Sequence, residues 1–148
     1  AAFWAERCAV GRALCAPAQL EFAAQSALPA PLCCRAQAGR LARAVDNLLD
    51  NAVRCTPPGG KVTLTASFAG GALRFAVRDT GPGFTPEALR KAGQLLYTGD
   101  AARGAHQGLG LYFARTVAEA HGGGLALQNN TPAPGAEAAL WVRAEAGG

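Results

Sequence analysis

Three short groups of polar and glycine residues follow one another between positions 47 and 110 of the chain. The first contains Asn47 and Asn51 on a predicted helix, the second is an Asp-x-Gly-x-Gly turn that begins at Asp79, and the third is a Gly-Leu-Gly turn at residues 108–110. Asparagine amide oxygens suit Mg²⁺, and the free N–H groups at the start of a helix favour phosphate. Each group alone has an ordinary structural explanation, but the three in this order predict a site for ATP.

The first group lies on one stripe of its predicted helix. Asn47, Asn51 and Arg54 are spaced at i, i+4 and i+7, so their side chains share a face. The two amides could hold a metal ion, and Arg54 could reach a phosphate. The alternative is a pair of solvent-facing asparagines on an amphipathic helix.

The second group follows a predicted strand. Residues two apart on a strand share a face, so Asp79 is expected to point toward the core with Phe75 and Val77. A buried carboxylate needs a partner, which makes Asp79 a candidate acceptor for an exocyclic amine such as adenine N6. Gly81 and Gly83 would let the backbone turn sharply near the base. The alternative is an ordinary loop.

Hydrophobic periodicity and turn residues predict the remaining elements. Helices are predicted over residues 3–14, 38–55, 86–92 and 108–121, and strands over residues 19–24, 31–35, 62–68, 73–79, 125–129 and 138–142. Gly108 is expected to open the last helix, with Leu109 and Gly110 in its first turn, although a plain N-terminal turn would look the same. Residues 93–107 are expected to form a loop, and residues 144–148 a frayed tail.

Composition argues against several classes of protein. Half of the 148 residues are apolar, which suits one globular domain, and no apolar run approaches the ~20 residues that span a bilayer. The formal charge is +4, but the arginines are scattered and form no basic stripe, so nucleic-acid binding is not expected. No signal peptide is visible at Ala1. Because the chain begins with Ala and contains no Met, we expect it to be a fragment of a longer protein.

The chain has five cysteines, an odd number without a C-x-x-C spacing. Buried reduced thiols are therefore expected, as in a cytosolic protein. Neither His106 nor His121 has the spacing of a zinc site.

The three groups together resemble the GHKL superfamily, and most of all the catalytic ATP-binding domain of bacterial sensor histidine kinases. Residues 47–54 are similar to the N box of that family, residues 79–84 to its G1 box, and residues 108–111 with the His-Gly-Gly at 121–123 to its G2 box and the turn that follows. The resemblance covers roughly residues 41–142. It implies an α/β two-layer sandwich, in which a mixed, mostly antiparallel sheet of about five strands is covered on one face by about three helices.

The resemblance also implies a role for each site residue. The nucleotide would be bound by Asn47, Asn51, Arg54, Asp79, Gly81, Gly83, Gly108, Leu109 and Gly110. Asn51 would bind Mg²⁺, Asp79 would read adenine N6, and the catalytic residues near the phosphates would be Asn47, Asn51, Arg54 and Arg103. Residues 84–107 would form a mobile ATP lid, with Gly108 and Gly110 at its hinge.

The chain departs from the family pattern at several positions. Cys55 stands where an aromatic residue often packs on the adenine, and residues 106–107 replace the Gly-x that commonly precedes the second glycine box. Thr98 stands where a lid arginine is frequent, which leaves Arg103 and Lys91 as candidate cations. These differences concern the lid more than the nucleotide assignment.

A kinase is favoured over a hydrolase. The hydrolysing relatives carry a Glu four residues before the metal-binding Asn, where it activates water, and here that position is Asn47, whose amide cannot take a proton. The resemblance implies a phosphoacceptor His that lies on a dimerisation helix and is followed by an acidic residue. Neither His106 nor His121 is followed by one, so the γ-phosphoryl group is expected to pass to a His on a dimerisation domain outside this chain. Residues 1–16 would be a helix continuing from that region, and residues 17–148 the catalytic domain.

The expected partners are this dimerisation domain and a response regulator protein. The domain alone is expected to be a monomer without membrane contact, and the full-length protein a homodimer whose catalytic part is cytoplasmic. Three alternatives stay open: an anti-sigma-factor-type serine kinase, a degenerate nucleotide-binding interaction module, and a globular domain with chance motifs. ATP binding without phosphoryl transfer would favour the interaction module.

Overall fold

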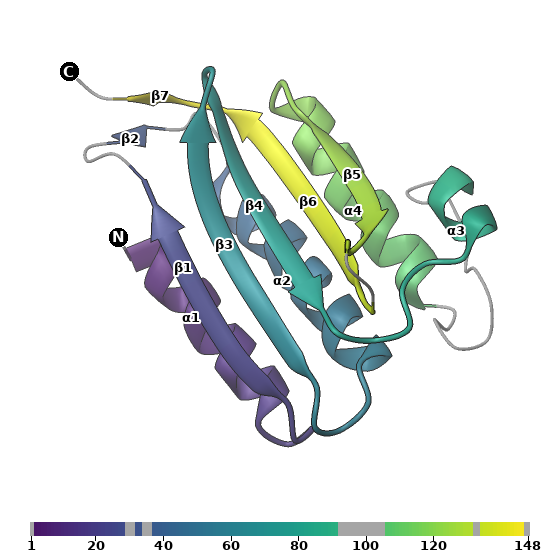
Figure 1. The fold of residues 1–148 in the computed structure, drawn as a ribbon. Coiled ribbons are helices and arrows are strands. Elements are labelled where there is room, and N and C mark those ends of the chain that lie inside the picture. The colour runs from purple at the N-terminus through teal and green to yellow at the C-terminus, as the bar shows by residue number, and fades with distance from the viewer. Residues whose placement is uncertain (1, 29–31, 34–36, 92–105, 132–133, 147–148) are drawn as a thin grey trace.

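The computed structural model describes residues 2–28, 32–33, 37–91, 106–131 and 134–146. The chain forms two layers, one of strands and one of helices (Figure 1). The helices are α1 (Ala2–Cys15), α2 (Ala38–Cys55), α3 (Pro86–Lys91) and α4 (His106–Ala120). The strands are β1 (Glu21–Ala27), β2 (Leu32–Cys33), β3 (Lys61–Ala69), β4 (Ala72–Asp79), β5 (Gly124–Asn129), β6 (Ala136–Arg143) and β7 (Glu145–Ala146).

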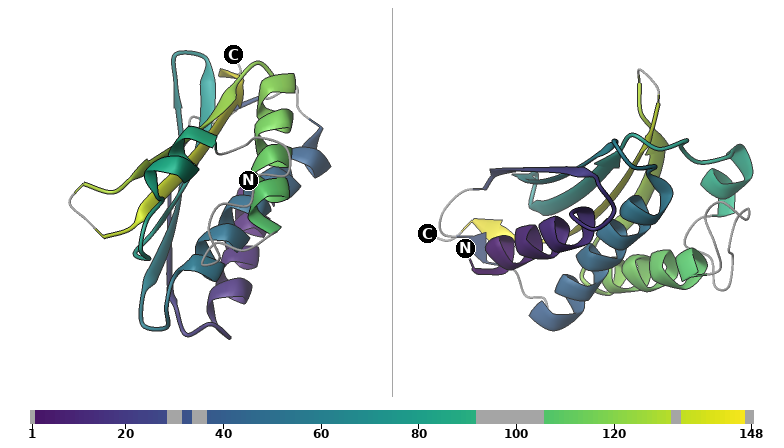
Figure 2. Two further views of the ribbon diagram at one scale, coloured as in Figure 1. Left: turned by 90° about the vertical axis from the view of Figure 1, so that its right-hand side faces the viewer. Right: turned by 90° about the horizontal axis from the view of Figure 1, so that it is seen from below.

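The main sheet has five strands in the order β1-β3-β4-β6-β5. β1 is parallel to β3, and the other neighbouring strands are antiparallel. A parallel pair needs a long crossover connection, and α2 supplies the helix in it. Helices α1, α2 and α4 all cover the same face of the sheet (Figure 2). The predicted mixed, mostly antiparallel sheet with helices on one face is therefore confirmed.

The core lies between the sheet and these helices, as the alternating burial of β3 shows most clearly. On β4, Leu73, Phe75 and Val77 are buried, and Phe75 lies opposite Ala66 of β3 and Leu140 of β6. The buried apolar residues of α2 recur with helical spacing: Leu41, Ala44, Val45, Leu48, Leu49 and Ala52. Burying one Leu or Val side chain fully contributes about 1.5–3 kcal/mol, so this face holds α2 against the sheet.

The turn between β3 and β4 is the two-residue connection that the sequence predicts. Gly70 and Gly71 have φ angles of 59° and 77°. A type I′ hairpin turn requires a positive φ at both central residues, which glycine adopts without strain.

Several predicted boundaries are wrong; β6, for example, spans Ala136–Arg143 rather than residues 138–142. Helix α4 begins at His106 rather than at Gly108, because neither residue of the His106-Gln107 pair breaks a helix, so Gly108 is the third helical residue. Strand β1 spans Glu21–Ala27 rather than residues 19–24, because Gln19 has a φ of 59° and belongs to the turn after α1.

The expectation of a frayed tail is wrong for Glu145 and Ala146. They form β7, which pairs antiparallel with β2, with Leu32 opposite Ala146 and Cys33 opposite Glu145. This small second sheet brings the tail beside a segment more than a hundred residues earlier in the chain. The other residues of the strand predicted over 31–35 lie outside the described ones.

Helix α1 packs on the domain itself. Its Phe3 ring lies 5.6 Å from the ring of Phe75 in the sheet, and α1 packs against both α2 and β1. The cysteines Cys8, Cys15 and Cys55 are buried and reduced, as expected. That α1 continues from a dimerisation region stays a prediction.

Candidate nucleotide-binding site

Asp79 closes β4 with its carboxylate turned toward the helix layer. It is 4% exposed and lies on the same face of the strand as the buried residues Phe75 and Val77, so the predicted orientation is confirmed. Its Oδ1 accepts a hydrogen bond of 2.9 Å from the Gly81 N–H. An ionised carboxylate has about four acceptor sites, so this bond is compatible with a further one to a ligand amine.

The turn after Asp79 packs tightly against the end of α2. A Cβ on Gly81 would lie 2.5 Å from the carbonyl oxygen of Cys55, so only glycine fits there. The Cys55 side chain is itself buried beside this contact. Figure 1 shows the end of β4 passing the C-terminal end of α2 before the chain turns toward α3. The Asp-x-Gly-x-Gly turn therefore meets the end of the helix that carries Asn47 and Asn51.

Strand β3 holds the next residue of the turn. The Thr80 N–H donates to the Lys61 carbonyl at 3.2 Å, and the Lys61 N–H donates to Thr80 Oγ1 at 2.9 Å. Gly83 has a φ of 84°, in the left-handed region that favours glycine. The backbone of this turn is thus fixed by its neighbours in the protein without a ligand.

The sequence analysis missed Asn129, the last residue of β5, and Asn130, which follows it; both hold the same turn. Asn129 makes two hydrogen bonds to the backbone of Phe84, and Asn130 Nδ2 donates to the Asp79 carbonyl oxygen at 2.9 Å. Asn129 and Asn130 precede a proline-containing stretch, and this pattern predicts only the end of a strand. Asparagine side chains often bind nearby backbone groups, so two in a row are the one feature of the sequence that could have indicated their role.

Asn51 is a buried polar residue on α2. It is 5% exposed, and its Oδ1 has no hydrogen-bond partner among the described residues. Leaving a buried acceptor unmatched costs about 1–3 kcal/mol, so such an atom marks a position where a ligand is expected. An amide oxygen is a hard neutral donor and fits a Mg²⁺ ion. The described residues contain no group of three or more His, Cys, Asp or Glu side chains able to hold a metal.

Asn47 joins α2 to α4. Its Nδ2 donates to the carbonyl oxygen of Gly110 over 3.4 Å, and a Cβ on Gly110 would lie 3.9 Å from the Asn47 Cβ. The first and third sequence groups therefore meet, as the prediction of one site requires. Gly108 and Leu109 lie in the first turn of α4, whereas the sequence predicted that Gly108 would begin the helix.

Of the two arginines predicted to lie near the phosphates, the structure describes only Arg54. Arg54 Nε lies 2.8 Å from Asp50 Oδ2, one helical turn away, and both side chains are about half exposed. Such an exposed i, i+4 pair contributes only about 0.3–0.5 kcal/mol, so the guanidinium can leave it at little cost. Arg103 and Thr98 lie outside the described residues, as does the Lys91 side chain.

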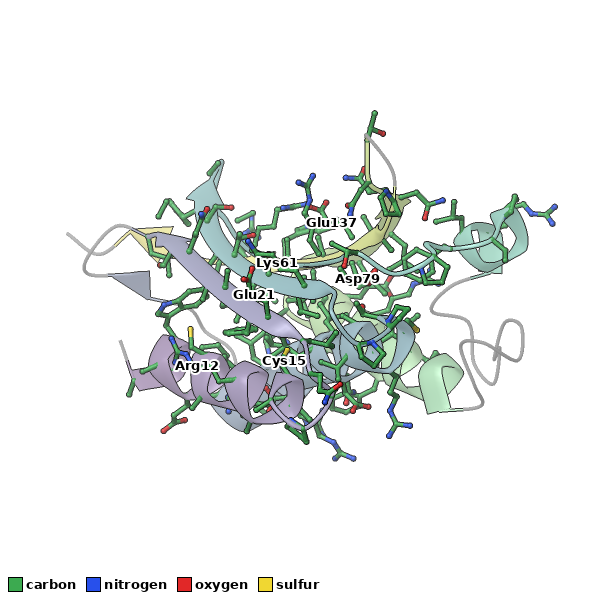
Figure 3. The ribbon with its side chains drawn as sticks, turned by 60° about the horizontal axis from the view of Figure 1, so that its bottom comes forward. Arg12, Cys15, Glu21, Lys61, Asp79 and Glu137 are labelled. Atoms are coloured by element: carbon green, nitrogen blue, oxygen red, sulfur yellow. The ribbon has the colours of Figure 1, made fainter. Side chains whose placement is uncertain are left out.

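The opposite face of the sheet carries a separate charged cluster (Figure 3). Glu137 of β6 is 8% exposed and accepts hydrogen bonds from Arg74, Arg78 and Gln128. It lies on the face away from the helices, whereas Asp79 lies toward them. The two buried carboxylates therefore have different surroundings, and only Asp79 belongs to the candidate site.

The structure is an α/β sandwich with a buried carboxylate on β4, a buried asparagine amide oxygen on α2 and a glycine turn that packs against the end of α2. A family model described as "Histidine kinase-, DNA gyrase B-, and HSP90-like ATPase" matches residues 36–146. The chain belongs to this family of ATP-binding domains.

Sensor histidine kinases are similar to the chain in sequence. The sensor histidine kinase SpaK of Bacillus subtilis is 44% identical over 99 residues, which are 66% of this chain and 21% of SpaK. The histidine protein kinase DivJ of Caulobacter vibrioides is 40% identical over 94 residues, which are 60% of this chain and 15% of DivJ. The chain therefore corresponds to about a fifth or less of these relatives.

Solved structures show the same fold over nearly the whole chain. The mycobacterial sensor histidine kinase MprB superposes with a TM-score of 0.80 at 25% identity, covering 97% of both chains. Full-length ShkA, solved in complex with AMPPNP, superposes with a TM-score of 0.81 at 29% identity, covering 99% of this chain and 30% of ShkA. The chain is thus an ATP-binding catalytic domain of the sensor histidine kinase type.

Proposed function

We propose that this chain binds Mg-ATP at the end of β4 and delivers the γ-phosphoryl group to a histidine on a dimerisation domain outside the chain. The observation that carries the proposal is a pair of buried polar groups, the Asp79 carboxylate and the Asn51 amide oxygen. Their elements meet where a Cβ on Gly81 would touch the carbonyl oxygen of Cys55, one helical turn after Asn51. An enclosed carboxylate can select an adenine amine, and an unmatched amide oxygen can hold a cation beside phosphates.

Each side chain would have a limited task. Asp79 would accept a hydrogen bond from adenine N6, while Gly81 and Gly83 would bring the backbone close to the base. Asn51, with Asn47 beside it, would hold Mg²⁺, which neutralises charge on the transferring phosphoryl group when bound. Arg54 could leave Asp50 to contact a phosphate, and Arg103 is a second candidate cation. Catalysis would then rest on positioning and charge neutralisation.

Asn47 also argues for transfer rather than hydrolysis. Its amide cannot take a proton from water at neutral pH, and its Nδ2 already donates to Gly110 O. We therefore expect slow ATP hydrolysis by the chain alone. The partners would be the dimerisation domain and a response regulator, in a homodimeric protein whose catalytic part is cytoplasmic. Within the described residues, no helix combines the length and apolar character needed to cross a bilayer.

Calorimetric titration with ATP, ADP and GTP, with and without Mg²⁺, tests the proposal. Adenine-selective binding that Mg²⁺ strengthens for ATP is the expected result, and no binding at millimolar nucleotide would contradict it. Phosphoryl transfer to a supplied dimerisation domain from a sensor histidine kinase tests the second half. ATP binding without any transfer would favour the interaction-module alternative.

A further inference from the structure

We propose that Asn129 and Asn130 are positioning residues for the nucleotide: from the end of β5 they fix the two ends of the turn formed by residues 79–84. This inference rests on the proposed function, because the turn is the part of the chain expected to contact the base. Neither asparagine is expected to touch the reacting phosphates. Their effect would reach the nucleotide through the backbone that they hold.

Asn129 binds one backbone residue in both directions. Its Oδ1 accepts a hydrogen bond of 2.7 Å from the Phe84 N–H, and its Nδ2 donates one of 3.0 Å to the Phe84 carbonyl. A side-chain amide offers one acceptor and two donors on a short stem, so it can replace a paired strand at this residue. A Cβ on Gly83 would lie 2.8 Å from Asn129 Oδ1. The position of the Asn129 amide therefore also favours glycine at residue 83.

Asn130 holds the other end of the turn. Its Nδ2 donates to the carbonyl oxygen of Asp79 at 2.9 Å and lies 3.3 Å from that of Pro134. Its own N–H donates to the Gly135 carbonyl at 2.9 Å, which closes the hairpin tip. A Cβ on Gly135 would overlap the Asp79 carbonyl oxygen, so the hairpin backbone lies directly against the residue that would read the base.

Asn129 lies outside the main core and is exposed. Phe84 packs with Ala136 and Leu127 in a small apolar cluster, and Leu127 also contacts the main core. Removing the Asn129 amide therefore opens no cavity among the buried residues of the helix layer. It removes both hydrogen bonds between Asn129 and the backbone of Phe84, so the turn would be held less firmly and more of its ordering would fall to nucleotide binding. A preordered turn binds more tightly because less conformational freedom is lost on binding.

The test compares Asn129→Ala, Asn129→Asp and Asn130→Ala with Gln128→Ala. Asn129→Asp keeps the shape and the acceptor but loses the donor to Phe84 O. Gln128 is the preceding residue, is also exposed, and bonds to Glu137 on the opposite face, which makes it the matched control. For each variant, calorimetry gives the ATP and ADP affinities, melting gives Tm, and hydrogen exchange reports on the Phe84 N–H.

The three asparagine variants are expected to lose about tenfold in affinity for ATP and ADP alike, the loss that one or two hydrogen bonds allow. Exchange of the Phe84 N–H should accelerate in both Asn129 variants, while Tm and the Mg²⁺ dependence stay near those of the wild type. Wild-type affinity in Asn129→Ala and Asn129→Asp would overturn the inference, as would an equal loss in Gln128→Ala. If the wild type binds no nucleotide, the proposed function fails instead.

Discussion

Arg7 of α1 and Asp46 of α2 form an ion pair, with 2.9 Å between Nε and Oδ1. The Arg7 side chain is 10% exposed, and its guanidinium carbon also lies 5.3 Å from the centre of the Phe3 ring. Burial raises the pKa of Asp46, and the neighbouring Arg7 charge opposes that rise. Since Asp46 faces α1 while the next residue, Asn47, contacts α4, the site-bearing helix is held from both sides.

Arg7→Ala is expected to lower the free energy of unfolding by about 1–3 kcal/mol at neutral pH, between the values for exposed and fully buried pairs. Without the cation, the pKa of Asp46 should rise further above its unfolded value. The folded state then holds the proton more strongly, so stability is lost as pH rises through the interval between those two pKa values.

The deficit of Arg7→Ala against the wild type should therefore be smaller near pH 4, about the ordinary carboxyl pKa, than at neutral pH. Denaturant unfolding at both pH values measures it. A deficit that does not change with pH would mean that the ion pair contributes nothing through Asp46.

Asp79→Asn is expected to abolish adenine nucleotide binding, because the amide can place a donor where adenine N6 also donates. Glu137→Gln is the matched control, since it replaces a buried carboxylate on the neighbouring strand, facing the other side of the sheet. Calorimetry should show ATP binding in the control and none in Asp79→Asn. Unchanged ATP affinity in Asp79→Asn would remove the adenine assignment.

Asn51→Ala is expected to weaken binding of ATP in the presence of Mg²⁺ far more than binding of adenosine without metal. The reason is that the substitution removes the buried Oδ1 and leaves Asp79 and the glycine turn in place. The comparison is made within the one variant, so a general loss of folding would reduce both affinities together. An equal reduction would show that Asn51 supports the fold and holds no metal.

Gly81→Ala is expected to remove nucleotide binding and lower Tm, because its Cβ would meet the Cys55 carbonyl at 2.5 Å and backbone would have to move. Gly39→Ala provides the contrast. It lies in the first turn of α2 with nothing within 4 Å of a new Cβ, so it should stabilise the helix by about 0.5–1 kcal/mol. Loss of stability in both variants would indicate that the contact at Cys55 is not the cause.

Cys8 and Cys15 are expected to resist alkylation in the folded protein and to react in denaturant. Burial raises the pKa of both thiols, although at Cys8 the charge of Arg12 partly opposes the rise. The unfolded chain ionises these thiols first as pH rises above 9.0, so stability should fall with alkalinity in that range. Rapid labelling of the native protein near neutral pH would contradict this.

Local pattern predicted much of the fold. The bounds of α2 agree with its periodicity because a proline pair follows it, and Thr56 Oγ1 closes its last turn by donating to the Ala52 carbonyl. The glycine pair of the β3–β4 turn and the inward direction of Asp79 were predictable for the same reason, since each depends on residues close in sequence.

Contacts distant in sequence account for what was missed. The pairing of β2 with β7 joins segments too short to show alternation. The contacts of Asn129 are with the backbone of Phe84, 45 residues earlier. Any residue type offers the same backbone groups, so the sequence at position 84 does not reveal this contact. The predicted start of α4 is wrong because both glycines lie within the helix, where Gly110 packs against Asn47, a contact distant in sequence.

The order of strands in the main sheet has a consequence for synthesis of the chain. Strand β6 lies between β4 and β5, yet it is made after both, and β5 has no other neighbour in the sheet. A ribosome that has released only the residues before Ala136 therefore presents β4 with one bare edge and β5 unpaired. Until β6 emerges, that backbone is open to chaperones or to aggregation, and the Asp79 turn lacks the hairpin that encloses it.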